Sequence, residues 1–310
     1  MKTKIWIALI ALYIVWGSTY LGIKVAIETI PPFFHAGIRF LASGLILLAW
    51  QKAAGQEMPT RPQWKSTFII GTLLLLGGNG LVAWAEQFIP SGIAALIIAT
   101  VPLSLVILEA FRPGGVKPNW QAFVGLAFGF VGIFILAGPA EISGSQSKLN
   151  PFGVAALLLA TVLWATGSIY SKNADLPKAS LVTTGAEMLM GSIGLFVVSL
   201  LTGELTGWNP AEVSARSLGG LAYLITVGSI VGFGSYIWLL GNAPISLVAT
   251  YAYVNPIVAV ILGYFLGNET LEPRIWIAAA VIIGAVMFIN SRNKPQVRRE
   301  AEEVRVESAQ

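Results

Sequence analysis

Ten long apolar stretches, separated by short connections, constrain this chain more than any other feature. They span residues 4–24, 33–50, 66–89, 91–111, 119–138, 151–171, 180–202, 217–240, 246–266 and 274–290. A bilayer core about 30 Å thick needs roughly 20 apolar residues per helix, which matches these lengths. Only 11% of the residues are charged, against about 25% in ordinary soluble domains. The sequence therefore predicts an all-α membrane protein with ten transmembrane helices.

The second half of the chain repeats the first. An offset of 148 aligns Trp16 with Trp164, Lys24 with Lys172 and Arg39 with Glu187. An offset of 154 aligns glycine, tryptophan and proline residues of the two halves. The pairs are Gly78 with Gly232, Gly80 with Gly234, Trp84 with Trp238, Pro90 with Pro244 and Pro102 with Pro256. Because each half has an odd number of spans, five, the two halves cross the membrane in opposite senses. Such inverted repeats are the common construction of secondary transporters.

The repeat sets the expected domain boundaries. Residues 1–138 form the first five-helix repeat, 139–150 an outer linker and 151–291 the second repeat. Residues 292–310 form a charged cytoplasmic tail. With the N-terminus inside, fourteen Lys and Arg side chains fall on the inner side and four on the outer side. Because cationic loops are retained in the cytoplasm, both termini are expected to be cytoplasmic.

Several phrases of the sequence resemble a known family. They include WGSTY at 16–20, AGIRFLASG at 36–44, PSGIAA at 90–95 and YAYVNP at 251–256. Together they are similar to the EamA branch of the drug/metabolite transporter superfamily, and within it to YedA-like inner-membrane exporters. The resemblance covers essentially the whole chain except the tail. It implies a ten-helix carrier in the bacterial inner membrane that exports small metabolites, amino acids or drugs, usually by ion coupling, and it leaves the substrate open.

Two ionisable residues lie inside predicted spans and occupy equivalent places in the two repeats. Arg39 and Glu187 are costly in a bilayer, which makes each a candidate for function. The functional hypothesis is that Arg39 binds a substrate carboxylate, while Glu187 binds a substrate amine or a coupling proton. The alternatives are a structural Arg–Glu pair, or an Arg39 side chain that extends outward to lipid headgroups.

Aromatic and amide side chains inside the spans complete the candidate substrate site. Trp16 and Trp164 lie well inside their helices, and an aromatic ring there can stack on a flat or cationic substrate. Asn79 and Trp84 follow the glycine pair 77–78 of the third span. Helix–helix packing is the alternative role for these side chains, since small residues and amides also mediate close packing in membranes.

The ninth span adds Tyr251 and Asn255, which are four residues apart on one helical face just before Pro256. The fourth span keeps the proline but has Ile97 and Val101 at the equivalent places. This asymmetry favours a binding role for the tyrosine and the asparagine, with a hydrogen bond to a neighbouring helix as the alternative.

Glu86, near the outer end of the third span, is expected to be solvated, and His35 is expected at the interface. Lys24 and Lys172, near helix ends, are expected to extend toward the interface.

The composition excludes several classes of protein. The chain has no cysteine, a single histidine and a single aspartate, and it carries no P-loop motif. No enzyme, ATP-driven pump, metal site or cofactor is therefore expected.

The expected function is secondary active export by alternating access, with proton coupling as one possibility. A passive facilitator or channel of the same fold is the alternative, and a receptor-like protein comes third. The expected partners are a small-molecule substrate and the lipid bilayer, with no nucleic acid, and the chain acts as a monomer or homodimer.

Overall fold

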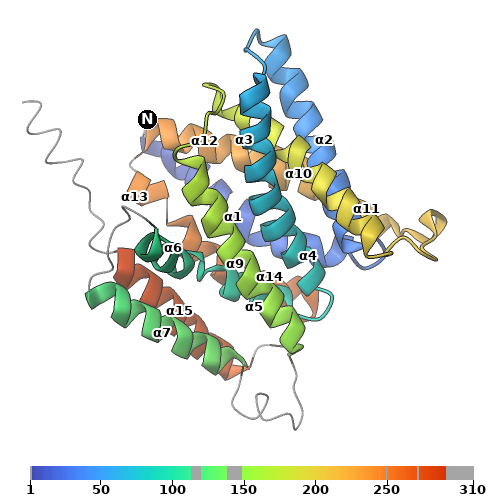
Figure 1. Cartoon of the computed structure of the whole chain (residues 1–310). Coiled ribbons are helices and arrows are strands. Elements are labelled where there is room, and N and C mark those ends of the chain that lie inside the picture. Colours follow the sequence, from blue (N-terminus) through green and yellow to red (C-terminus); the bar gives the residue numbers. More distant parts are fainter. Residues whose placement is uncertain are drawn as a thin grey trace, which may run out of the picture.

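The fold is known from a computed structural model, which describes residues 2–112, 120–137, 149–243, 245–248, 250–270 and 272–290. Within these ranges the chain is entirely helical (Figure 1). The predicted tail and most of the predicted linker lie outside the described residues. Among the described residues, seven helices are long and apolar enough to cross a membrane, and three shorter apolar helices accompany them. The ten correspond one to one with the ten predicted stretches.

The first repeat contains five spans built from seven α-helices and one π-helix. Their bounds are α1 (Lys2–Ala26), α2 (Pro32–Ala53), α3 (Arg61–Gly71), η1 (Thr72–Gly80), α4 (Leu81–Ala85), α5 (Ser91–Ile98), α6 (Val101–Phe111) and α7 (Trp120–Ala137). The third span runs through α3, η1 and α4, and the fourth through α5 and α6. We call the end of the molecule where α1 and α4 end and α2 and α5 begin the outer end, and the opposite end the inner end.

The second repeat has the same plan. Its elements are α9 (Pro151–Ser171), α10 (Ser180–Leu201), the short 3-10 turn η2 (Pro210–Glu212), α11 (Ala215–Tyr223), the π-helix η3 (Leu224–Val231), α12 (Gly232–Asn242), α13 (Ile245–Val248), α14 (Tyr251–Gly267) and α15 (Pro273–Asn290). Prolines begin α2, α9 and α15, where the missing N–H costs nothing because the first turn leaves its donors unpaired. The Asn150 carboxamide caps α9 by accepting the N–H of Phe152 at 2.9 Å.

Each half packs on the other through equivalent elements, so that a contact made by the first half on the second is repeated by the second on the first. Helix α2 packs along α10, and α7 along α15, so each of these spans meets its own counterpart. Helix α1 packs against α12 and α14 of the second half, while α9 packs against η1 and α6 of the first. Trp16 lies against Gly232, and its counterpart Trp164 lies against Gly78, the counterpart of that glycine. This exchange is the packing expected of two inverted repeats.

Two features of the spans were not predicted. The third and eighth spans each contain a π-helical segment, η1 and η3, just where the repeat aligns them. The wider turn of a π-helix is often found at functional sites. The fourth span is interrupted at Ala99–Thr100, just before Pro102, and α14 begins at Tyr251, one turn before Pro256. The break therefore lies closer to the proline in the first half than in the second.

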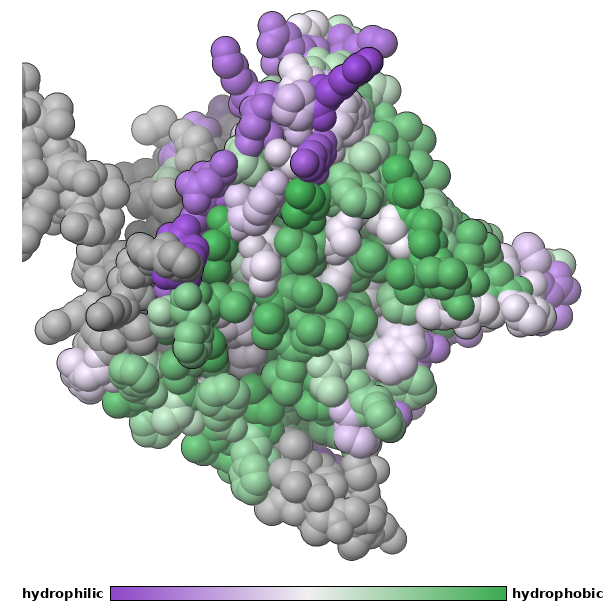
Figure 2. Space-filling model, viewed as in Figure 1, coloured by the Kyte–Doolittle hydropathy of each residue, from purple (hydrophilic) through white to green (hydrophobic). Residues whose placement is uncertain are grey.

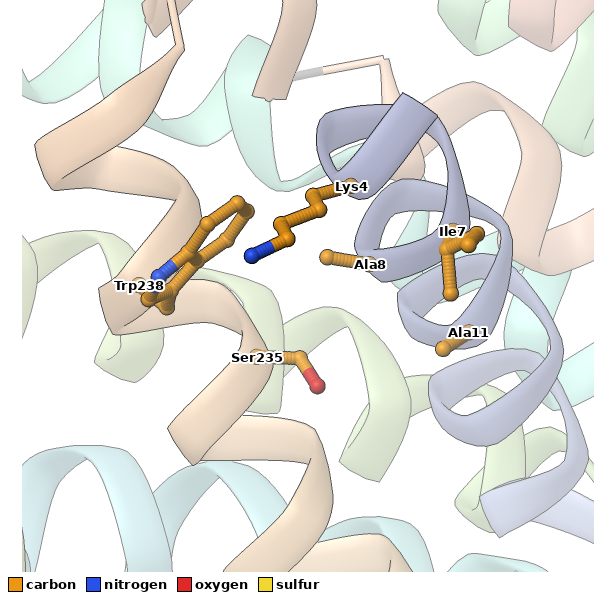
Figure 3. Close-up of a pocket in the computed structure, with 6 residues that line it drawn as sticks. All are labelled: Lys4, Ile7, Ala8, Ala11, Ser235 and Trp238. Carbon is orange, nitrogen blue, oxygen red and sulfur yellow. The ribbon is translucent and has the colours of Figure 1, made fainter. Parts of the chain in front are cut away.

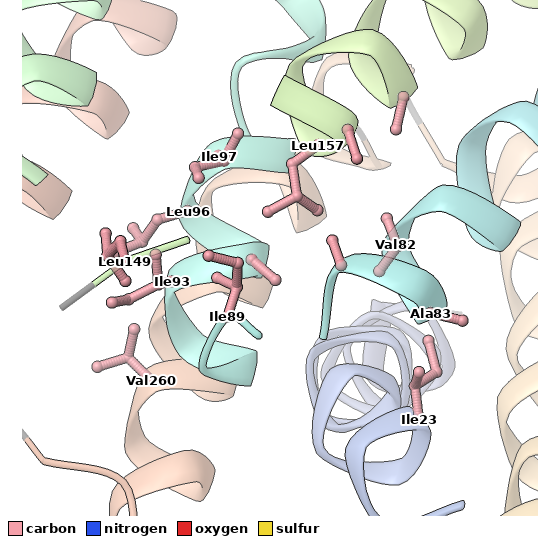
Figure 4. Close-up of a cluster of buried hydrophobic side chains, with 14 of the residues drawn as sticks. Ile23, Val82, Ala83, Ile89, Ile93, Leu96, Ile97, Leu149, Leu157 and Val260 are labelled. Carbon is pink, nitrogen blue, oxygen red and sulfur yellow. The ribbon is translucent and has the colours of Figure 1, made fainter. Parts of the chain in front are cut away.

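The core joins both halves, and the outside of the bundle is apolar. Figure 4 shows Ile23 of α1 and Ile93 of α5 in one cluster with Leu157 of α9 and Val260 of α14. Large apolar side chains such as Phe111, Phe123 and Trp276 are exposed. Figure 2 shows apolar side chains over the middle of the visible face and polar ones at its top, over the connection between α2 and α3. An apolar band with a polar end is the surface expected in a bilayer.

The closest backbone approach between the third and seventh spans yields a stability prediction. A Cβ atom on Gly71 would collide with the backbone of Glu187 and Gly191. We expect Gly71→Ala to lower the free energy of unfolding by about 1–3 kcal/mol, as overpacking does. Gly234→Ala is the matched control, because no atom lies within 4 Å of its added Cβ. Thermal denaturation in detergent should show a lower Tm for the first variant alone, and equal Tm values would contradict this packing.

Candidate functional site

Three aromatic rings of the second half gather around Trp16 of the first half, and we call these four rings the aromatic cluster. The Trp16 ring centroid lies 5.2 Å from those of Phe233 and Tyr236 and 5.0 Å from that of Tyr251. Tyr236 and Tyr251 meet edge to face at 5.8 Å. Such tilted and edge-on geometries are the favoured ones for aromatic pairs. The structure therefore brings together two of the predicted residues, Trp16 and Tyr251.

Phe233 and Tyr236 of α12 were missed by the sequence reasoning. The signal that could have found them is their neighbour Gly232, because a ring packed on that glycine also reaches the side chains one residue and one turn further on. Within the described residues, no hydrogen bond holds the hydroxyls of Tyr236 or Tyr251.

Hydrogen bonds connect α1 to the start of α14 beside the aromatic cluster. The Tyr13 hydroxyl bonds to the Thr250 hydroxyl. With its amide nitrogen turned toward them, Asn255 donates to the carbonyls of Tyr251 at 3.1 Å and Tyr13 at 3.2 Å. Asn255 thus makes the hydrogen bond to a neighbouring helix that was the alternative to substrate binding. Its binding role stays a prediction.

The counterpart region in the first half has different chemistry. Trp164 packs on Gly78 of η1. The positions equivalent to Phe233, Tyr236 and Tyr251 hold Asn79, Val82 and Ile97, so Trp164 has no matching set of aromatic rings. The Asn79 amide donates to the Leu74 carbonyl at 3.4 Å inside the π-helix, and Trp84 packs edge to face on Phe88 at 5.2 Å. The pseudo-symmetric frame therefore carries an asymmetric lining.

Arg39 and Glu187 do not pair with each other. Arg39 is 4% exposed, its Nε donates to the Ser229 hydroxyl of η3 at 3.1 Å, and its guanidinium lies 4.8 Å from the Phe40 ring centroid. Glu187 of α10 makes no hydrogen bond or ion pair with any residue that the structure describes. The contact of Arg39 with the second half is therefore through Ser229, a residue that the sequence reasoning did not single out.

Buried polar groups cluster at the outer end, and two expectations about them are wrong. Glu86 is fully buried instead of solvated. The half-buried Lys24 donates its ammonium N–H to the Glu86 backbone carbonyl at the end of α4. His35 is 1% exposed instead of interfacial. In each case neighbouring helices cover a position that lies close to a helix end, which hydropathy along one span does not reveal.

Two carboxylates of the second half hold the outer end of the first half. Glu269, just after α14, accepts the N–H of Ser91 at 2.6 Å and of Gly92 at 3.1 Å, at the start of α5. Glu204, after α10, accepts the N–H of Phe34 at 2.6 Å at the start of α2. Neither helix start has a side-chain cap of its own. A carboxylate at a helix N-terminus is favoured by the unpaired N–H donors and by the helix dipole. These contacts join the two halves at the outer end.

Ion pairs and a groove lie toward the inner end. Glu109 pairs with Arg112 at 3.0 Å, and its other oxygen lies 3.4 Å from the exposed Lys172 ammonium. An open groove of about 310 Å³ lies between the inner ends of α1 and α12, lined by Lys4, Ile7, Ala8, Ala11, Ser235 and Trp238. Figure 3 shows the Lys4 side chain reaching toward Trp238 across this groove. In the described part of the chain, no three His, Cys, Asp or Glu residues are placed to hold a metal ion.

Comparisons with known proteins agree on one family. The sequence pattern of the EamA-like transporter family matches residues 3–138 and again residues 151–291. The inner membrane transporter YedA of Escherichia coli is 40% identical over 91% of this chain and 89% of its own length. The PecM protein of Dickeya dadantii is 28% identical over 90% and 92%. A solved crystal structure with 19% identity has a TM-score of 0.62 over 91% of this chain and 96% of that one, which supports the fold.

The contacts of Glu269 at the outer end yield a prediction about access. In a chain carrying Val260→Cys, a buried reporter beside Gly92, we expect Glu269→Gln to speed labelling by a membrane-impermeant maleimide. The loss of a charge-assisted bond of about 1.5–3 kcal/mol implies about a tenfold to hundredfold rise. Glu212→Gln is the control, since its carboxylate bonds only within the outer loop, to Asn209. Equal labelling rates in the two variants would refute the closing role of Glu269.

Proposed function

The chain belongs to the EamA-like transporter family, and we propose that it is a secondary active exporter working by alternating access. It is a membrane transporter and not an enzyme. The observation that carries the proposal is the exchanged packing of the two halves, Trp16 on Gly232 and Trp164 on Gly78. Two nearly equivalent arrangements of one frame give two states of similar energy, open at opposite ends. The repeats 1–138 and 151–291 are the two moving halves, joined by the linker at 139–150.

The proposed substrates are small zwitterionic or amphipathic metabolites, amino acids or drugs. Arg39 supplies a buried cation for a substrate carboxylate, and its remaining guanidinium nitrogens are not used by the Ser229 bond. The aromatic cluster supplies ring faces and two hydroxyl groups for the apolar or cationic part of the same molecule. Asn79, Trp84, Trp164 and Asn255 are proposed to line the path, and Glu187 is proposed to bind a substrate amine or a coupling proton. The transport unit is a monomer or a homodimer.

The proposed location is the bacterial inner membrane with both termini in the cytoplasm. The fourteen-to-four distribution of Lys and Arg supports this orientation. Since the chain has no cysteine, single reporters test it directly. We expect Thr206→Cys to react with an impermeant maleimide in intact cells and Gln56→Cys to react only after permeabilisation. The reverse pattern would overturn the orientation.

Transport in liposomes tests the function itself. With a pH gradient imposed, we expect saturable uptake and counterflow of some members of a labelled panel of amino acids and metabolites. Arg39→Ala should weaken apparent affinity by about tenfold to hundredfold, the value of a charged hydrogen bond of about 1.5–3 kcal/mol. Glu187→Gln should remove the dependence on the gradient.

The matched controls are Arg61→Ala and Glu57→Gln, because both side chains are exposed near the inner end. They should leave transport unchanged. Equilibration that ignores the gradient and the substitutions of Arg39 and Glu187 would instead favour a passive facilitator and return both residues to structural roles.

A further inference from the structure

The Glu86 side chain is a buried acid without a partner. It directly follows α4, and its backbone N–H bonds to the Val82 carbonyl at 2.9 Å. The residue is 0% exposed, and neither carboxyl oxygen has a hydrogen-bond partner among the described residues. Buried polar side chains nearly always have such partners, so this group calls for an explanation.

Among the described residues, the charged groups that interact electrostatically with Glu86 make no hydrogen bond to its carboxyl oxygens. On α1, the Lys24 ammonium bonds to the backbone carbonyl of Glu86 and not to its carboxyl group. On α2, the Arg39 Nε bonds to Ser229. After α14, the Glu269 carboxylate holds the start of α5. Tyr20 of α1 is the remaining titratable group that interacts electrostatically with Glu86.

The side chain also has apolar neighbours along its own segment. Val82, Ala83, Ala85 and Ile89 belong to the buried core that joins the two halves. An ionised carboxylate without hydrogen bonds in such surroundings costs far more than a neutral acid, because water no longer solvates the charge. The closed arrangement of the outer end therefore suits the neutral acid.

We propose that Glu86 is a proton-binding site of this transporter, occupied while the outer end is closed and emptied when that end opens. On opening, water reaches the carboxyl group, the O–H bond breaks and the proton leaves to water. The carboxylate that remains is solvated and faces the Lys24 and Arg39 cations. On closing, one proton from water forms the O–H bond again. This inference rests on the proposed alternating access, and it assigns a coupling ion to a residue other than Glu187.

The proposal predicts how pH shifts the conformation. Because the closed state holds one proton more than the open state, acid favours closure and alkali favours opening, by up to about tenfold per pH unit. The reporter is again Val260→Cys, and its labelling rate is divided by that of an exposed Thr206→Cys reporter to remove the pH dependence of thiol chemistry. In the wild-type background we expect this ratio to rise with pH.

The Glu86→Gln variant separates this site from other acids. Glutamine has nearly the shape of the neutral acid, so the variant should fold with a Tm close to that of the wild type and should stay closed at every pH. Glu212→Gln, an exposed acid of the outer loop whose carboxylate bonds to Asn209, is the control and should keep the pH response. A Glu86→Gln chain that fails to fold, or whose labelling still rises with pH, overturns the proposal, because either result means that Glu86 is ionised or uninvolved.

An infrared measurement gives a second readout that needs no labelling. At neutral pH in lipid, the carbonyl band of a protonated carboxylic acid should be present in the wild type and lost in Glu86→Gln. Equal spectra in this region would overturn the proposal. Both experiments proceed without a transported substrate, so failure to find transport would count against the proposed function alone.

Discussion

The packing of each half's tryptophan on the other half's glycine is the contact on which the rest of the architecture depends. Trp16 reaches Gly232, and Trp164 reaches Gly78, because glycine leaves room for an indole ring against the helix backbone. Both glycines lie at or beside a π-helical segment, where the turn is wider. In lipid there is little hydrophobic force to drive helices together, so this close packing has to hold the halves in register.

Two equivalent halves do not by themselves give a specific substrate site. The side chains around Trp16 and Trp164 differ between the halves. The second half surrounds Trp16 with Phe233, Tyr236 and Tyr251, whereas the first half offers Trp164 an asparagine and aliphatic side chains. The outer end is held by Glu204 and Glu269, which come from the second half and bind helix starts of the first. In this account the repeated frame allows the two halves to move against each other, and the residues that differ between the halves supply the binding groups.

The fold was largely predictable because hydropathy and helix length are local properties in a bilayer. The ten spans follow from apolar runs, and the inverted repeat follows from glycine, tryptophan and proline matches, since these residues have fixed roles in packing. The π-helices and the break at Ala99–Thr100 were not predictable, because they depend on how one span meets another.

The site was predictable only in part. Trp16 and Tyr251 were named and lie together, but Phe233, Tyr236 and Ser229 were missed, because the repeat comparison emphasises positions that match. Glu86 was expected in solvent, because depth along one helix does not show which neighbours cover it. The roles of Arg39, Asn79, Trp84, Trp164, Glu187 and Asn255 stay predictions.

The central claim is that two inverted halves open alternately at opposite ends, and distances between spin labels in liposomes test it most directly. One label pair replaces Gln87 and Thr270 at the outer end. The other replaces Phe111 and Asn242 at the inner end. These residues end the fourth and eighth spans, which the repeat relates to the ninth and third spans that carry the outer pair. The account predicts two distances for each pair, with the longer outer distance accompanying the shorter inner one as conditions change. A single unchanging distance at both ends, or lengthening at both ends together, would contradict it.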